Sequence, residues 1–274
     1  MAALCESLHV SRAGFYAWRQ ERETARAARD LELAPKVCDI FWRHKRRYGA
    51  RRIAEELHAQ GESCGVAHVA KLLKMQGLRA IQPKSFVPKT TNSRHRLGYQ
   101  SNLLLNAKPP TGVNQVWVAD ITYISLKTGR FAYLAVLLDL FSRRIIGWSL
   151  DDHMEESLVL GALRQAIRQR QPPANLIHHS DRGGQYAGKQ YRAILRRAHV
   201  RQSMSRADTV SDNSFMESCF GTIKTELEMT EYDNCLDAET EVVDYFHYYN
   251  SERLHSSLNY LTPIGFEELN YHPI

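Results

Sequence analysis

The stretch from His178 to Glu226 reads HHSDRGGQYAGKQYRAILRRAHVRQSMSRADTVSDNSFMESCFGTIKTE. It holds two acidic residues, Asp181 and Glu217, with 35 residues between them, and a third acid, Asp120, interrupts an apolar run upstream. Carboxylates in apolar surroundings are costly to hold together unless a cation offsets their charge. Three converging acids therefore predict a divalent metal site and phosphoryl-transfer chemistry.

The apolar pattern around these acids predicts a mixed β-sheet flanked by helices, an α/β fold. Three apolar segments separated by turns indicate an antiparallel meander, and strands then alternate with helices. The expected strands are 115–126, 131–139, 144–150, 175–179 and 200–204. The expected helices are 155–169, 189–198, 213–228 and 237–250, followed by an irregular tail with Pro263 and Pro273.

Asp120 and Asp181 occupy positions where such a sheet exposes functional groups. Alternation places Asp120 mid-strand on one face, and a carboxylate there is rare without a partner. Asp181 follows a short strand and precedes two glycines, at the strand end that open α/β sheets use for ligands. A salt-bridged or capping role for Asp120, and simple turn chemistry for Asp181, remain open.

Glu217 lies in the first turns of an expected helix, where two interpretations compete. With Ser214 it fits a capping box, and acids favour helix N-termini in any case. Lys224 follows two turns later on the same face, which suits a helix lying against a phosphodiester backbone. His178 and His179, at a strand end, either contact substrate or metal or are simply hydrogen-bonded.

Charge divides the chain into a basic first part and an acidic second part. Residues 1–110 carry 20 Lys and Arg against 9 Asp and Glu, whereas residues 111–274 carry 16 against 21. This asymmetry predicts a nucleic-acid-binding module joined to a part that binds cations or performs chemistry. The alternative is a solvated surface that happens to be basic.

The basic part is expected to be helical. Helices are predicted over 2–8, 12–18 with Ser11 as N-cap, 36–44 opened by Pro35, 51–60 and 66–76, with 20–33 as a solvated helix or linker. A helix, a short glycine-containing turn and a second helix form the geometry that places a helix in a major groove. Residues 2–18 resemble the second half of such a motif. A small helical bundle without DNA contact is the alternative.

Basic and polar side chains along the chain are candidate DNA contacts, above all the turn at residues 45–49. These candidates are Arg12, Lys45, Arg46, Arg47, Arg51, Arg52, Asn213, Lys224, Arg253 and His255. For Arg253 and His255 a helix end with favourable C-terminal cations is an equal alternative. The expected division is a helical DNA-binding region (1–79), a basic linker (80–111), a catalytic core (112–230) and a C-terminal helix and tail (231–274).

Several protein classes are excluded by composition. No apolar run reaches the ~18 residues of a membrane span, and the first residues lack the pattern of a signal peptide, so no membrane association is expected. Five scattered cysteines, an odd number, argue against a disulfide scaffold and fit a reducing cytoplasm. Cys38, His44, Cys64 and His68 do not have standard zinc-ligand spacing.

Several motifs together carry a resemblance to a known family. They are Trp117-Val118-Ala119-Asp120-Ile121-Thr122-Tyr123, His179-Ser180-Asp181-Arg182-Gly183, Asp212-Asn213-x3-Glu217-Ser218, Lys224, and Tyr249-Asn250-x2-Arg253-x-His255-x2-Leu258 through Thr262-Pro263. Over residues 1–270 the chain resembles the OrfB-type transposases of bacterial insertion sequences of the IS-three family, whose core is similar to retroviral integrases.

The resemblance implies an RNase-H-like five-stranded core with Asp120, Asp181 and Glu217 as catalytic residues and metal ligands. It implies two Mg²⁺ ions, with Mn²⁺ as a substitute, that serve 3′-end cleavage and strand transfer. The implied partners are the element's terminal inverted repeats, target DNA, an upstream OrfA protein, and further copies in a dimer or larger assembly. The implied location is the bacterial cytoplasm, at the nucleoid.

The chain departs from the family pattern at three places outside the triad. Gly184 replaces the usual Ser, the loop 206–211 lacks the usual Lys-Gly, and Cys219 stands where Phe is usual. These departures bear on loop mobility and DNA grip, and a degraded copy of the element is an alternative. Two other functions are weighed as well: a metal-dependent nuclease that never joins DNA, and an inactive transposase-derived DNA-binding protein. The basic first part argues against the nuclease, and retention of all three acids argues against the inactive protein.

Overall fold

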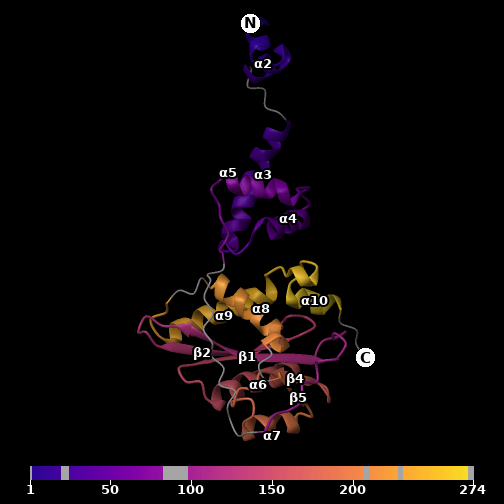
Figure 1. Cartoon of the computed structure of the whole chain (residues 1–274), viewed down its shortest axis with the longest axis vertical. Coiled ribbons are helices and arrows are strands. Elements are labelled where there is room, and N and C mark those ends of the chain that lie inside the picture. Colours follow the sequence, from indigo (N-terminus) through magenta and orange to yellow (C-terminus); the bar gives the residue numbers. More distant parts are fainter. Residues whose placement is uncertain (1, 20–24, 83–97, 207–209, 228–230, 271–274) are drawn as a thin grey trace. The chain divides into compact units, whose positions relative to one another are not determined.

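The structure, a computed structural model, describes residues 2–19, 25–82, 98–206, 210–227 and 231–270 (Figure 1). The chain forms two compact units, residues 1–81 and residues 82–274. In the described residues no helix is long and apolar enough to cross a membrane. All five cysteines are free thiols.

The first unit is entirely helical. Its helices are α1 (Ala2–Ser7), α2 (Arg12–Arg19), α3 (Ala25–Arg43), α4 (Ala50–Ala59) and α5 (Val66–Met75). Ser11 caps α2 as expected, because its Oγ accepts the N–H of Gly14 at 3.0 Å. Helices α3, α4 and α5 pack together around buried apolar side chains, namely Leu33, Val37, Ile40, Phe41, Ile53, Leu57, Val69 and Leu72.

The start of α3 corrects the expectation that Pro35 opens a helix. The helix begins ten residues earlier, at Ala25, and Pro35 lies inside it. Proline removes one backbone hydrogen bond from a helix. The helix continues nevertheless, and Leu33 and Val37 on either side of the proline are fully buried against α4 and α5. Residues 20–24 of the expected linker lie outside the described residues.

The second unit is built on the expected mixed five-stranded sheet. Its strands are β1 (Val116–Ser125), β2 (Phe131–Asp139), β3 (Ile145–Asp151), β4 (Ile177–Ser180) and β5 (Arg201–Met204), in the order β3-β2-β1-β4-β5. The first three form the antiparallel meander, and β4 and β5 run parallel to β1. This topology makes β1 the central strand and places β4 beside it.

Helices cover both faces of the sheet (Figure 1). On one face lie α6 (Glu156–Arg170) and α7 (Lys189–Arg197), packed on a buried cluster that includes Trp117, Ala119 and Tyr191. On the other face lie α8 (Ser214–Glu226), α9 (Cys235–Ser251) and α10 (Pro263–Leu269). Because side chains alternate along β1, Asp120 faces away from the Ala119 cluster, toward α8.

The C-terminal segment is more regular than expected. An irregular tail is predicted from Pro263 and Pro273, but α10 begins at Pro263, and Thr262 caps it by accepting the N–H of Gly265 at 3.0 Å. Proline favours the first position of a helix, where its missing N–H costs nothing. Glu267 of α10 is buried and accepts hydrogen bonds from Ser142, Arg144 and Arg170. Pro273 lies outside the described residues.

Part of the expected linker belongs to the second unit. Asn102 Nδ2 donates to Asp212 Oδ2 at 2.9 Å, and the N–H of Leu103 donates to Ser203 Oγ at 2.9 Å. The segment 98–111 is thus bonded to the sheet and to the loop before α8. Residues 83–97 of the expected linker lie outside the described residues.

Candidate active site

Two of the three predicted acids lie side by side, Asp120 within β1 and Asp181 directly after the neighbouring strand β4. The register of the parallel pair β1–β4 ends with Ala119 opposite Ser180. Asp120 and Asp181 are the next residues of each segment, so the two carboxylates meet where β4 ends. The sequence pattern did predict that Asp181 follows a strand, but not that this strand is the neighbour of β1.

The backbone beside each aspartate orients its carboxylate. Beyond Ala119, the N–H of Ile121 donates to Asp120 Oδ1 at 2.8 Å instead of joining a strand ladder. The Asp181 carboxylate is oriented locally as well, since its Oδ1 accepts the N–H of Gly183 at 2.9 Å. Each acid therefore has one oxygen held by a backbone donor.

Electrostatics link all three acids. Burial raises the pKa of Asp120 well above its ordinary value of 3.8, and the negative charges of Asp181 and then Glu217 raise it further. These causes mean that the three carboxylates act on one another. Mutual repulsion of this kind is what a bound cation relieves.

The helix that carries Glu217 starts differently from a capping box. Asn213 is the N-cap residue of α8 without a side-chain cap, and Ser214 is already the first helical residue. The capping-box interpretation of Ser214 and Glu217 therefore does not describe this helix. The Glu217 side chain is exposed on the first turn. It remains available for chemistry.

Asn213 ties α8 to the central strand. Its side chain is buried, and Nδ2 lies 3.5 Å from the carbonyl oxygen of Ala119. This contact connects the N-terminus of α8 to the residue before Asp120. The predicted DNA contact of Asn213 is therefore corrected, because the buried side chain has a structural position.

The residues present fit a divalent cation. Carboxylate oxygens are the ligands that Mg²⁺ prefers. The carboxylates of Asp120, Asp181 and Glu217 repel one another, and a bound cation would relieve this repulsion. They do not form a closed cage: among the described residues, only Asp151, Asp152 and His153 place three ligand atoms within 4.8 Å of one another. That second group lies on the surface at the end of β3.

Lys224 lies beside the same strand. Its Nζ is 3.9 Å from the centre of the Tyr123 ring, on β1. Burial lowers the pKa of the half-buried Lys224, and the charge of Asp120 opposes this effect. Lys224, the cation predicted on the same helix as Glu217, is thus close enough to Asp120 for the two charges to interact.

The two histidines before Asp181 are structural in this arrangement. His178 Nε2 is 2.8 Å from the hydroxyl of Tyr191. His179 Nδ1 is 2.8 Å from Ser203 Oγ, and its Nε2 is 3.1 Å from the Asp212 carbonyl oxygen. Both are fully buried, which supports the hydrogen-bonded interpretation rather than contact with substrate or metal.

Asp212, five residues before Glu217, is a further residue of this region that the sequence pattern did not single out. Its Oδ2 accepts hydrogen bonds from Asn102 and from the N–H of Arg206. The Arg206 guanidinium holds the pKa of this carboxyl well below its ordinary value of 3.8. Asp212 thus anchors the loop that leads into α8. In the sequence, only its position next to Asn213 pointed to such a role.

The C-terminal candidates for DNA contact have protein partners. Arg253 is only 3% exposed and donates to both carboxylate oxygens of Glu226, so its assignment to phosphate is corrected. His255 is half-buried, with Nδ1 3.0 Å from Ser257 Oγ. The alternative of a structural helix end therefore describes this region better.

The basic turn of the helical unit is exposed. Lys45 and Arg46 are exposed and adopt left-handed backbone conformations, with φ of 49° and 63°. Arg51 on α4 and Arg12 on α2 are also exposed. The remaining candidates are half-buried, and the Arg52 guanidinium lies 5.5 Å from the Tyr48 ring centre.

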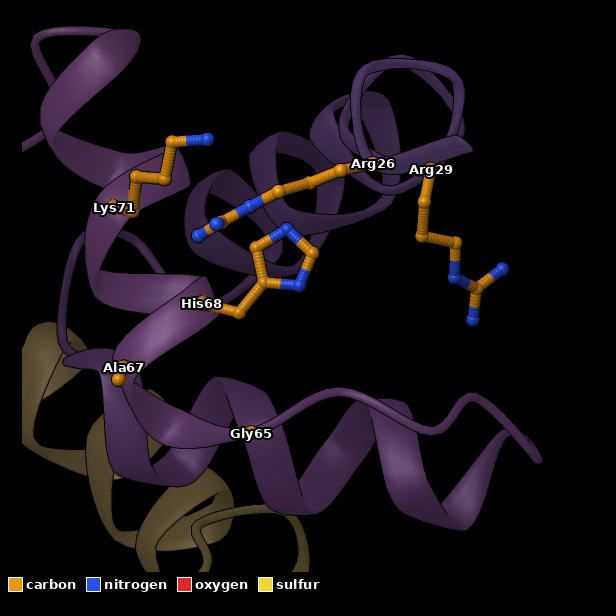
Figure 2. A pocket seen from close by; sticks show the side chains of 6 residues that line it. All are labelled: Arg26, Arg29, Gly65, Ala67, His68 and Lys71. Carbon is orange, nitrogen blue, oxygen red and sulfur yellow. The ribbon is translucent and has the colours of Figure 1, made fainter. Parts of the chain in front are cut away.

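The helical unit also contains a cavity of about 520 Å³, lined by Arg26, Arg29, Gly65, Ala67, His68 and Lys71 (Figure 2). Figure 2 shows Arg26 extending over His68 toward Lys71, while Arg29 points away. Most of the positive charge is already neutralised. Asp30 pairs with His68 and Lys71, and Glu62 pairs with Arg29. The cavity is therefore not a strong anion site.

Three protein families match the chain. Two are described as integrase core domain and match residues 110–209 and 198–263. The third, an HTH-like domain, matches residues 28–86. The integrase matches span the sheet, both aspartates and the Glu217 helix. With the observed topology, they confirm the expected RNase-H-like class.

Curated relatives match along nearly the whole chain. An insertion element IS600 protein of 31 kDa from Shigella sonnei is 39% identical over 98% of both chains. The transposase InsF for insertion sequence IS3A from Escherichia coli K12 is also 39% identical, over 98% of this chain and 94% of the transposase.

Solved structures show a weaker likeness. The HTLV-2 integrase catalytic core domain in complex with magnesium, in its dimeric form, is 19% identical with a TM-score of 0.45, over 57% of this chain and 98% of that chain. An intasome of simian T-cell lymphotropic virus in complex with PP2A regulatory subunit B56 gamma is 18% identical with a TM-score of 0.49, over 87% of this chain and 75% of that chain.

Proposed function

Because the chain belongs to the IS3 family of insertion-sequence transposases, we propose that it cleaves the 3′ ends of an insertion element and joins them to target DNA. One observation carries the proposal. Asp120 and Asp181 lie next to each other at the end of β4, and the charge of Glu217, on α8, acts on Asp120. Mere DNA binding has no use for three acids at this place.

Asp120, Asp181 and Glu217 would hold two Mg²⁺ ions, or Mn²⁺ as a substitute, which activate the attacking oxygen and stabilise the leaving oxygen. The protein's part is to hold ionised carboxylates in place through the N–H groups of Ile121 and Gly183. No protein nucleophile is required, since water and then a 3′-hydroxyl attack phosphorus. Lys224 is positioned to attract the donor phosphodiester.

In this proposal the helical unit binds the DNA. Its match to an HTH-like domain and its exposed basic turn support binding to the element's terminal inverted repeats. We assign residues 1–79 to this task, 112–230 to catalysis, and 231–274 to support of the core. An upstream OrfA protein, assembly of two or more copies on paired DNA ends, and action at the cytoplasmic nucleoid complete the proposal.

An oligonucleotide assay tests the proposed reaction. Purified protein is mixed with a labelled end of its own element and Mg²⁺ or Mn²⁺, beside a chelator control and the Asp181→Asn variant. We expect nicking at the 3′ end and joined products that require metal and disappear in the variant. Nicking without joining would favour the nuclease. Binding without cleavage, even with the upstream protein added, would indicate an inactive protein.

A further inference from the structure

The helices on the two faces of the sheet belong to segments of opposite charge. Residues 157–206, which include α7 and nearly all of α6, carry 10 Lys and Arg against a single acid, Asp181. Residues 214–274, which include α8, α9 and α10, carry 2 Lys and Arg against 12 Asp and Glu. The face covered by α6 and α7 is therefore strongly basic, although the second unit as a whole is acidic.

Most of these cations have no partner within the fold. Arg170, Arg182, Arg192 and Arg206 donate to Glu267, Ser205, Gly98 and Asp212, respectively. The other six are exposed, and their side chains have no ion pair or hydrogen bond among the described residues. We call these six the α6–α7 basic surface: Arg164, Arg168, Lys189, Arg196, Arg197 and Arg201.

Helical spacing places these cations on the outer sides of α6 and α7. Arg164 is two residues from each of the buried Ala162 and Ala166, so it lies on the opposite side of α6. Lys189 and Arg197 have the same relation to the buried residues of α7. The two helices pack against each other on one buried cluster, on the same face of the sheet (Figure 1). Their outer sides therefore form one continuous surface.

The composition of this surface indicates its ligand. Lys189 and Arg196 are two turns apart, roughly 10 Å along the helix, so the charges suit an extended polyanion better than one small anion. Between residues 156 and 206, all of which the structure describes, no large apolar side chain is exposed. Protein interfaces and membrane-bound helices both need apolar contacts, whereas surfaces that bind DNA are polar and positively charged.

We propose that the α6–α7 basic surface binds the phosphate backbone of duplex DNA, independently of base sequence. Asp120 faces α8, on the other side of the sheet, so the bound duplex is a segment other than the one that reacts. Contacts to phosphate position DNA without reading its bases. This surface adds a second place of DNA binding to the helical unit, and binding there requires neither the three acids nor a metal.

Arginine labelling by phenylglyoxal tests this binding at the surface itself. The full chain is labelled without divalent metal at increasing concentrations of a duplex of arbitrary sequence, and mass spectrometry follows each arginine. We expect the duplex to protect Arg164 and Arg168. Arg130, an exposed arginine beside Asp152 on the turn after β1, is the reference and should keep its labelling rate.

Neutralising α7 should weaken the protection measured on α6. In Arg196→Gln/Arg197→Gln, the duplex concentration that half-protects Arg164 should rise severalfold, and its salt dependence should fall by about 0.9 per lost phosphate contact. The matched control is Lys127→Gln/Arg130→Gln, two exposed cations of the same unit with acidic neighbours, and it should behave like the wild type. The melting temperature should not change, because the replaced arginines are exposed and glutamine is a good helix former.

Unchanged labelling of Arg164 and Arg168 in the wild type would overturn the proposal. Equal protection of Arg130 would show unspecific coating and would overturn it too, as would protection by phosphatidylserine vesicles or polyglutamate but not by duplex. If the duplex protects Arg164 in a chain that neither nicks nor joins DNA, the proposed reaction fails and this binding surface stands. Joining by a chain whose Arg164 stays unprotected would reject the surface alone.

Discussion

Arg253 and Glu226 form a buried ion pair that joins the chain after α9 to the end of α8. Arg253 Nη2 donates to Glu226 Oε1 at 2.7 Å, and its Nε donates to Oε2 at 2.8 Å. The Tyr245 hydroxyl donates to the same carboxylate at 3.1 Å. Because α8 also carries Glu217, this pair fixes the far end of the helix on which the third catalytic acid lies.

Replacing Arg253 should therefore damage stability rather than DNA contact. Arg253→Met leaves the Glu226 carboxylate buried without a cation, which should lower the free energy of unfolding by roughly 3–5 kcal/mol. Urea unfolding measures this loss. Arg168→Met, an exposed arginine on α6, is the control and should stay within about 0.5 kcal/mol of wild type. Unchanged stability with weakened DNA binding would return Arg253 to a phosphate role.

Acid should destabilise the fold through His178. Burial lowers its pKa from 6.5 to about 3, so the unfolded chain binds a proton that the folded chain does not between these values. Its contribution is therefore complete above pH 6.5 and is lost as the pH falls below it, at about 1.4 kcal/mol per pH unit. Burial lowers the pKa of His179 too, which adds to the effect.

The measurement is the free energy of unfolding from pH 7 to pH 5. The double variant His178→Phe/Tyr191→Phe should lose stability less steeply than Tyr191→Phe alone, which keeps the histidine and lacks only its hydroxyl partner. Equal slopes for these two proteins would show that His178 does not resist protonation in the fold.

Neutralising the exposed turn of the helical unit should weaken DNA binding broadly. Lys45→Asn/Arg46→Asn removes two charges, and asparagine tolerates the left-handed backbone found there. We expect weaker binding to every sequence tested and a salt dependence reduced by about 0.9 per lost phosphate contact. Lys74→Gln/Arg79→Gln removes two exposed charges elsewhere in this unit as a control. The same salt slope in both double variants would contradict a specific role for the turn.

Lys224 should act on donor binding more than on chemistry. Lys224→Ala removes the cation between the Tyr123 ring and Asp120, so the donor end should dissociate more readily while the single-turnover rate at saturating DNA changes little. Lys127→Ala, on the exposed turn after β1, controls for loss of one positive charge. Equal dissociation constants for wild type and Lys224→Ala would reject this role.

Local patterns were sufficient to predict the sheet. Alternating and continuous apolar runs predicted the ends of each strand to within about two residues. A strand buried on one face alternates apolar and polar residues, and a strand buried on both faces is apolar throughout. Pro35 misled because its helix-breaking tendency was outweighed by the burial of Leu33 and Val37. The α10 helix was not predicted because Pro263 suggests an irregular segment, whereas it occupies the first turn of the helix.

The site was predictable as a set of residues but not as a geometry. Asp120 and Asp181 could be singled out by their context, yet only the β1–β4 register brings them together. An arginine that binds phosphate and one that binds a buried glutamate look identical in sequence, which explains the error at Arg253.

The central claim is that Glu217 completes a catalytic triad with Asp120 and Asp181, and single-turnover strand joining with Mg²⁺ tests it most directly. Glu217→Gln is compared with Glu241→Gln, an exposed helical glutamate on α9, after both are shown to bind the donor end like wild type. We expect joining to vanish in Glu217→Gln and to persist in Glu241→Gln. Joining at the wild-type rate by Glu217→Gln would contradict the triad.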